Sequence, residues 1–177
     1  MMGYAQALAD FPRDQAEWRR EVAERHDDSA SRSTARGFDR AATEIEAIAD
    51  DHPWISTLVA AGWLTADGFQ AEGGPADRYL RQFNRYEAMS WEDLLFSLAM
   101  FAGGDDVWLS YANSLRGRAA KFDLILTPLR RQDTHRPQWE SYSLRTRMGT
   151  NRVEQDTLLG LDRYLTSLET ARDTRKP

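Results

Sequence analysis

The spacing of apolar residues changes along the chain, and this change limits the fold more than any other feature of the sequence. In residues 35–50 the apolar side chains recur every three or four positions, the period of one face of an α-helix. Residues 121–127 and 139–148 are instead short runs with strand-like composition or alternation. The pattern predicts an α+β fold that is mostly α, with a helical N-terminal half packed on a small α/β half with a short sheet.

Local signals set the expected ends of the helices and strands. Pro12, preceded by Asp10 as a cap, is expected at the first position of a helix, and Pro53 is expected to open a helical run that ends near Gly68. The segment 107–111 fits either a short strand or a helical turn. The helix that begins at Pro12 is predicted to span 12–26. Further helices are predicted over 35–50, 75–88, 91–102 and 152–170.

Gly73-Gly74-Pro75 is the strongest breaker of regular structure in the sequence. It predicts a boundary between a helical N-terminal region, residues 1–72, and a second region, residues 75–177, that ends in a helix. Within the second region, a polar loop that contains Pro137 separates the two strand-like runs. Runs 121–127 and 139–148 are therefore predicted to pair as adjacent antiparallel strands.

Composition excludes several classes of function. The 177 residues include no cysteine, so disulfides, cysteine-ligated zinc, iron–sulfur clusters and thiol nucleophiles are ruled out. The start of the chain lacks the basic and apolar segments of a signal peptide. The longest nearly apolar run, residues 94–102, is too short to span a bilayer. We therefore expect a cytoplasmic protein without a membrane partner.

Charge is distributed unevenly along the chain. The net charge is −5, yet residues 112–152 contain nine basic and three acidic side chains, a local net charge of +6. Such a basic segment indicates a phosphate-binding surface. The alternative is that it neutralises the acidic segments within the fold or across a homo-oligomer.

Two acidic residues near the strand-like runs suggest a metal-dependent chemistry. Asp123 lies in KFDLIL, Glu140 lies in WESYSL 17 residues later, and the segment VEQDTLLGLDRYLTSLE follows. This order resembles the PD-(D/E)xK nuclease superfamily. The resemblance implies that Asp123 and Glu140 hold the metal and that an acidic residue on the first helix, here Glu92, assists.

The chemistry of the carboxylate pair agrees with this resemblance. Two carboxylates on adjacent strands can hold Mg²⁺, which prefers oxygen ligands and activates bound water for phosphodiester hydrolysis. The sequence departs from the family at the lysine two residues after the glutamate, where Tyr142 stands. Lys121, two residues before Asp123 and so on the same face of a strand, could replace it.

The basic segment would supply the contacts to nucleic acid. Five arginines flank the expected hairpin and should form one positive surface: Arg130, Arg131, Arg136, Arg145 and Arg147. The sequence thus predicts a nuclease-like domain that acts on nucleic acid, or a degenerate one that only binds it.

Two other interpretations remain open. The Gly103–Asp106 tetrapeptide resembles the GGDD turn of nucleotide-cyclising palm domains, with Asp67 as the upstream partner, although it also fits a helix end followed by an acidic helix start. Alternatively, the chain is a non-catalytic subunit that binds a protein partner or a second copy. The apolar stripes in residues 38–48 and 158–168 would then form its interface.

Overall fold

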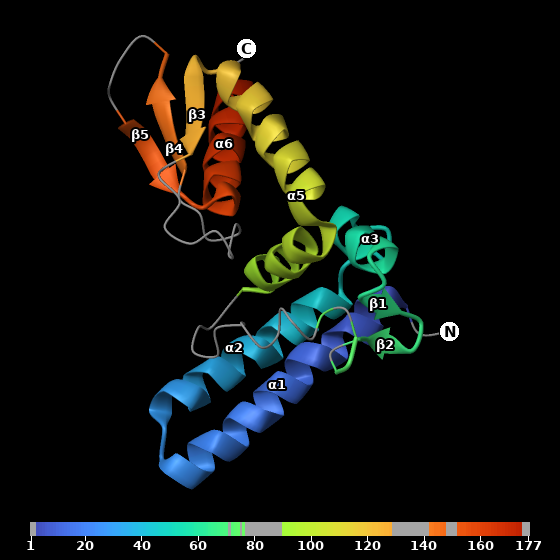
Figure 1. Ribbon diagram of the computed structural model, residues 1–177. Helices are drawn as coiled ribbons and strands as arrows, with labels where there is room; N and C mark the ends of the chain where they lie inside the picture. Colours follow the sequence, from blue (N-terminus) through green and yellow to red (C-terminus); the bar gives the residue numbers. More distant parts are fainter. Residues whose placement is uncertain are drawn as a thin grey trace. The chain divides into compact units, whose positions relative to one another are not determined.

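The computed structural model describes residues 3–70, 72–74, 76, 90–128, 142–147 and 152–174. It divides the chain into two compact units, Met1–Gly103 (unit 1) and Gly104–Pro177 (unit 2). Most of the described residues are helical, and two small antiparallel sheets accompany the helices. The predicted class, α+β and mostly α, is therefore confirmed (Figure 1). None of the helices in these ranges combines the length and the apolar character needed to cross a membrane.

The division between the units falls at a break inside the longest helix. Helix α5 (Trp91–Ala120) contains a non-helical residue, Gly104, with φ 64° and ψ −161°. Glycine tolerates this positive φ because it has no Cβ. The two compact units are therefore separated in the sequence at Gly103–Gly104. The domain boundary predicted at Gly73–Pro75 stays a prediction. The helix predicted over 75–88 lies outside the described residues.

Unit 1 is built on two antiparallel helices, α1 (Tyr4–His26) and α2 (Ser29–Glu46), which lie side by side (Figure 1). Asp28 caps α2 by accepting a hydrogen bond from the Ala30 N–H at 2.9 Å. The helices bury mainly small and apolar side chains, so their backbones can approach closely. The largest fully buried ones are Leu8, Phe38 and Ile45.

Helix α1 begins earlier than its proline suggests. Pro12 is an interior, buried residue of α1 and not the first residue of the helix. Because proline has no N–H and crowds the preceding turn, this position normally disfavours helix. Tertiary contacts offset that cost: Leu8 and Phe11 are buried, and the Ala5 N–H donates to Asp50 Oδ1 at 2.8 Å.

Helix α3 (Pro53–Ala60) ends before the expected Gly68. Gly62, with φ 73°, terminates it: the Gly62 N–H donates to the Val59 carbonyl, and the Trp63 N–H donates to the Leu58 carbonyl at 2.9 Å. This is the hydrogen-bond pattern of a glycine-terminated helix. The following residues form a short hairpin of β1 (Leu64–Thr65) and β2 (Gly68–Phe69).

The first part of α5, residues 91–103, belongs to unit 1 and begins where the sequence indicates. The Asp93 N–H donates to Ser90 Oγ at 3.1 Å, and that hydroxyl donates to the Asp93 carboxylate at 2.6 Å. Buried apolar side chains follow from Leu94 to Met100. Phe96 contacts Trp54 with ring centroids 5.3 Å apart.

Unit 2 contains the second part of α5, a three-stranded sheet and helix α6 (Leu158–Asp173). The segment 107–111, left open by the sequence, is helical. Strands β3 (Leu124–Pro128) and β4 (Tyr142–Thr146) pair antiparallel, with Leu126 opposite Leu144. The predicted pairing of the two strand-like runs is confirmed over these residues.

The third strand was not expected. Residues Arg152–Asp156 form β5, which pairs antiparallel with β4, whereas the sequence predicted that they begin the last helix. Helix α6 begins only at Leu158, where Thr157 Oγ1 accepts a hydrogen bond from the Gly160 N–H at 3.2 Å. The predicted start of the last helix at residue 152 is therefore wrong, since the sheet pairing of residues 152–156 overrides it.

One face of the sheet forms the core of unit 2. Leu124, Leu126 and Leu144 are buried on this face, as are Leu158, Leu161 and Leu165 of α6. On the other face, Ile125 is 45% exposed. The alternation of burial along β3 is that of a strand with one covered face.

His52 couples the structure of unit 1 to pH. Its Nδ1 caps α3 by accepting a hydrogen bond from the Trp54 N–H at 3.2 Å, and its ring lies beside those of Trp54 and Trp91. Burial disfavours the charged ring and lowers the pKa of His52, while Asp51 raises it by a smaller amount. Protonation of Nδ1 would also remove the acceptor that caps α3.

We therefore expect stability to fall as pH decreases through about 6.5, the ordinary histidine pKa, toward the lower pKa of folded His52. In that window the unfolded chain binds a proton that the folded chain does not bind. His52→Asn keeps a capping side chain that does not titrate. Urea unfolding followed by tryptophan fluorescence should show a weaker pH dependence in the variant, and an unchanged dependence would contradict the assignment.

Candidate functional site

Asp123 lies in a turn and not on a strand. Residues 121–123 connect α5 to β3, and Asp123 has a left-handed backbone with φ 55°. The alternation of strand faces therefore does not apply between Lys121 and Asp123, and the expectation that they share a strand face is wrong. Aspartate and asparagine adopt this backbone more readily than most residues.

Lys121 lies close enough to a different part of unit 2 to act on a carboxylate there. Its charge acts with that of Arg118 to lower the pKa of Glu169 on α6, although the hydrogen bond from Arg118 is the larger cause. Nothing in the described residues joins Lys121 to Asp123. The proposed replacement of the family's lysine by Lys121 thus has no geometric support.

Asp123 instead lines a pocket of about 300 Å³ at the edge of β3. The pocket brings together the end of α5, the turn, β3 and the residue that follows β4. The Arg147 N–H donates to the Asp123 carbonyl at 2.9 Å, which holds these segments together. The lining residues are Arg116, Ala120, Asp123, Leu124, Ile125, Leu126 and Arg147.

Two arginines give the pocket its positive charge. The side chains of Arg116 and Arg147 are exposed, and within the described residues neither pairs with a carboxylate. Arg116 donates one hydrogen bond to the side chain of Asn113 at 2.5 Å. Both guanidinium groups can therefore bind an anion without first losing an ion pair.

Arg145 adjoins the same pocket. It lies on β4 directly opposite Ile125, one of the lining residues, and its side chain is half-buried. Its Nε makes a long hydrogen bond of 3.4 Å to Ser143 Oγ. Arg145 and Arg147 are the two of the five predicted nucleic-acid-binding arginines that fall within the described residues, and both lie at this end of the sheet. Arg130, Arg131 and Arg136 lie outside the described residues.

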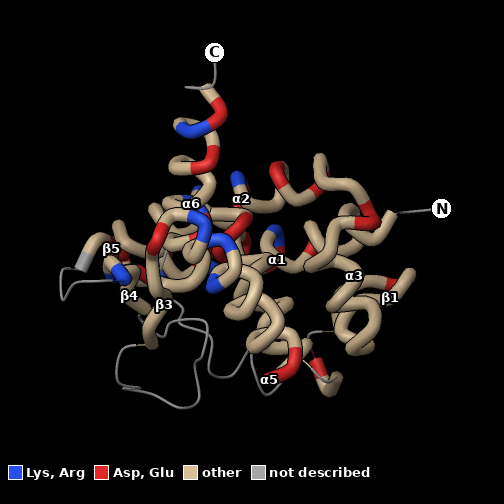
Figure 2. Tube along the Cα trace, turned by 90° about the horizontal axis from the view of Figure 1, so that it is seen from above, with Lys and Arg blue, Asp and Glu red and all other residues tan. Residues whose placement is uncertain are grey.

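The charge of the chain divides between the two units. Unit 2 has 13 basic and 10 acidic side chains, a net charge of +3, whereas unit 1 has 10 basic and 18 acidic ones, a net charge of −8. Figure 2 marks these residues along the chain. The basic pocket thus belongs to the positive unit, and its arginines are not consumed by the acidic residues described in that unit.

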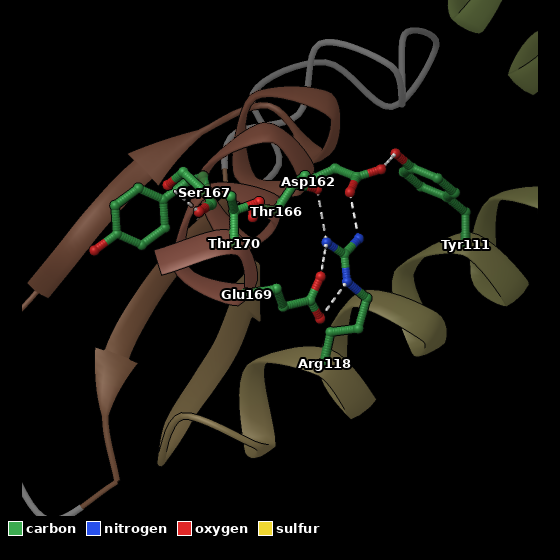
Figure 3. A network of polar contacts seen from close by, with 8 residues as sticks. Tyr111, Arg118, Asp162, Thr166, Ser167, Glu169 and Thr170 are labelled. Carbon is green, nitrogen blue, oxygen red and sulfur yellow. Dashed lines mark hydrogen bonds and ion pairs between the residues drawn. The ribbon is translucent and has the colours of Figure 1, made fainter. Parts of the chain in front are cut away.

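The other basic residue of α5, Arg118, contacts α6 instead of the pocket. Arg118 extends from α5 to α6, where its Nε and Nη2 donate to the two carboxylate oxygens of Glu169 at 3.1 and 2.8 Å (Figure 3). It also contacts Asp162, which accepts a hydrogen bond from the Tyr111 hydroxyl. The hydrogen bond to Thr166 Oγ1, at 2.8 Å, completes the set.

The contacts of Arg118 and Tyr111 with α6 stabilise the packing of the two helices. The hydrogen bond to Glu169 raises the pKa of Arg118, with Asp162 contributing in the same direction. Burial, followed by the hydrogen bond to Asp162, raises the pKa of Tyr111. The network therefore keeps a neutral phenol and a charged guanidinium, and it ties the two helices of unit 2 together.

The described residues do not assemble a metal site. No group of three histidine, aspartate or glutamate side chains in the described ranges is placed to hold a metal ion. Glu140, the expected partner of Asp123, lies outside those ranges, so the Asp123–Glu140 pair stays a prediction. Glu92 lies in the first turn of α5 in unit 1, whereas Asp123 belongs to unit 2.

Tyr142, at the position of the family's lysine, has a structural role. Its side chain is buried, and its hydroxyl accepts a hydrogen bond from Trp108 Nε1 at 3.2 Å. The rings of Tyr142 and Trp108 also lie close, with centroids 6.1 Å apart. Tyr142 thus belongs to the core of unit 2, where it joins β4 to α5.

The other acidic and histidine motifs have structural roles. Both sides of the Gly103–Asp106 tetrapeptide are helical, so the hairpin that a cyclase-like palm would need is absent from this position. Asp105 and Asp106 instead begin the second part of α5, where acidic side chains favour a helix start. His26 lies in the last turn of α1, where a basic side chain favours the helix end.

The two apolar stripes offered as partner surfaces are interior. In residues 158–168 and 38–48, most members of each stripe are buried within the chain itself. The buried members are Leu158, Leu161, Leu165, Phe38, Ala41, Ala42 and Ile45. Most of each stripe therefore packs inside the chain, and assembly through the stripes stays a prediction.

A scan of known protein families, a search of curated proteins and a search of solved structures found no match to this chain. The function must therefore be argued from the site itself. Arg116 is the charged residue of the pocket that was not selected from the sequence. It was counted in the basic segment, but only the folded chain places it next to Arg147.

The Arg118 network generates a stability prediction. Arg118→Gln removes a charged, two-pronged contact that is only 22% exposed, and it leaves Asp162 and Glu169 without their cation. We expect the free energy of unfolding to fall by about 1–3 kcal/mol. Arg116→Gln, two residues away and exposed, is the matched control and should change it by less than about 0.5 kcal/mol. Equal effects in urea unfolding would contradict a special role for Arg118.

Proposed function

We propose that unit 2 binds nucleic acid through the pocket at the edge of β3. The observation that carries the proposal is the convergence of Arg116 and Arg147, from separate segments, on one pocket without carboxylate partners in the described residues. Phosphate groups are bound well by guanidinium groups that offer several N–H donors in one plane. Arg145 extends the positive surface along the sheet.

The charge distribution supports a local interaction rather than a general affinity for polyanions. The net charge of −5 disfavours non-specific attraction over long distances. Screening limits such long-range effects to about 8–10 Å at physiological salt. Binding would then depend on the few phosphates that reach the arginines of the pocket.

The proposal covers binding and not cleavage. A hydrolytic site would need further ligands around Asp123, and the described residues do not supply a group of them. In this reading the Asp123 carboxylate at the pocket is an unfavourable neighbour for phosphate. Its left-handed turn conformation is itself a reason for an aspartate at this position.

Substitution of Arg147 tests whether the pocket contacts phosphate. Arg147→Gln should weaken binding of a labelled oligonucleotide, measured by fluorescence anisotropy, and reduce the slope of log affinity against log salt by about 0.7–0.9. Stability should change little, because the side chain is exposed. Arg172→Gln removes the same charge from an exposed position near the end of α6 and serves as the control.

The two variants have the same net charge, so bulk electrostatics affects both equally. A loss confined to Arg147→Gln supports contact between phosphate and the pocket. Equal affinities of the two variants, or the absence of salt-sensitive binding by the wild type, would contradict the proposal.

Asp123→Asn tests whether the carboxylate at the pocket opposes or supports oligonucleotide binding. Asparagine keeps the left-handed backbone at this position, so the turn should persist. Removal of the negative charge beside the arginines should strengthen oligonucleotide binding, by roughly two- to fivefold. A metal ligand would behave oppositely: if binding requires Mg²⁺ and is lost in Asp123→Asn, the nuclease-like interpretation is favoured instead.

A further inference from the structure

The pocket at the edge of β3 contains more than an anion site needs. Besides its two arginines and Asp123, the pocket is lined by Ala120 of α5 and by Leu124, Ile125 and Leu126 of β3. Ile125 is 45% exposed, on the face of the sheet opposite the core. A phosphate group is fully hydrophilic, so apolar walls indicate that a less polar part of the ligand also enters.

The free edge of β3 adds hydrogen-bonding groups to this pocket. The bond from the Arg147 N–H to the Asp123 carbonyl makes residues 123, 125 and 127 the ones that bond to β4. Leu124 and Leu126 therefore direct their backbone N–H and C=O groups away from β4. In the sheet as described, β3 is an edge strand, and both residues line the pocket.

We infer that the pocket binds an unpaired base of single-stranded nucleic acid, an inference that rests on the proposed function. The edge N–H and C=O groups of Leu124 and Leu126 match the donors and acceptors on the edge of a base. Ile125 and Ala120 contact its flat face, and Arg116 and Arg147 bind the adjoining phosphates. Guanidinium groups also stack on bases.

Size and access favour a single strand over a duplex. A pocket of about 300 Å³ is at the small end of the range of about 300–1,000 Å³ for small-molecule sites, so it takes one small group rather than a helix. In a duplex the base edges are paired and the bases are stacked. Only an unpaired base can therefore present both its face and its edge to β3.

The edge is poorly suited to the other ligand that free strands bind, an extended peptide. Strand addition needs a row of backbone hydrogen bonds. The next outward position after Leu126 is Pro128, which has no N–H, and the described strand ends there. The outward N–H groups of Leu124 and Leu126 are enough to bind a base. They are too few for the row of backbone hydrogen bonds that an added peptide strand needs.

The test compares three probes on the full chain, each at a low and at a raised salt concentration. They are a short single-stranded oligonucleotide, its duplex with the complementary strand, and an abasic strand of the same length. The single strand should bind roughly tenfold or more tightly than either other probe. Salt-sensitive binding that depends on Arg147 but is equal for all three probes would overturn the single-strand inference and leave the proposed function standing. Absence of salt-sensitive binding would overturn both.

A variant that fills the pocket tests whether the preference for the single strand arises there. Ala120 is an exposed residue of α5 that lines the pocket, so Ala120→Leu fills space without altering charge. It should reduce the affinity for the single strand to that for the duplex. Ala171→Leu makes the same change at an exposed position on α6 and should keep the wild-type preference. Equal preferences in the two variants would overturn the inference.

Discussion

The pairing of β3 with β4 is the constraint on which the candidate site depends. Its register places the residue after β4, Arg147, opposite the turn residue Asp123, and a backbone hydrogen bond of 2.9 Å joins the two. The same register decides which groups of β3 remain free at the edge of the sheet. A shift by one residue would exchange the core and solvent faces of β3 and would bury Ile125 in place of Leu124 and Leu126.

Sequence reasoning recovered this pairing because the two strands have strong strand composition and a breaker between them. It failed for β5, where Arg152–Asp156 contains four polar residues and one valine and therefore resembles the start of a helix. Such a strand exists because β4 offers it a partner, and that information is not local. The same limit explains Pro12, whose place inside α1 depends on the burial of Leu8 and Phe11.

The site was recovered only in part, for the same reason. Asp123 and Arg147 were selected as a metal ligand and a phosphate ligand, and the fold brings them to one pocket. Strand alternation was then applied to Lys121, but it fails where the chain turns. Tyr142 could be read as a lost catalytic position until its contact with Trp108 showed it to be a core residue. Arg116 and Arg118 are two residues apart on one helix, and only the position of α6 separates their roles.

The two units carry net charges of opposite sign, and the net charge of the whole chain does not show this. A net charge of −5 describes neither unit, because +3 and −8 are carried on opposite sides of Gly104. Near any polyanion the two units experience forces of opposite sign. A polyanion would therefore attract unit 2 and repel unit 1, so that the charge of unit 1 opposes contact through its own surface.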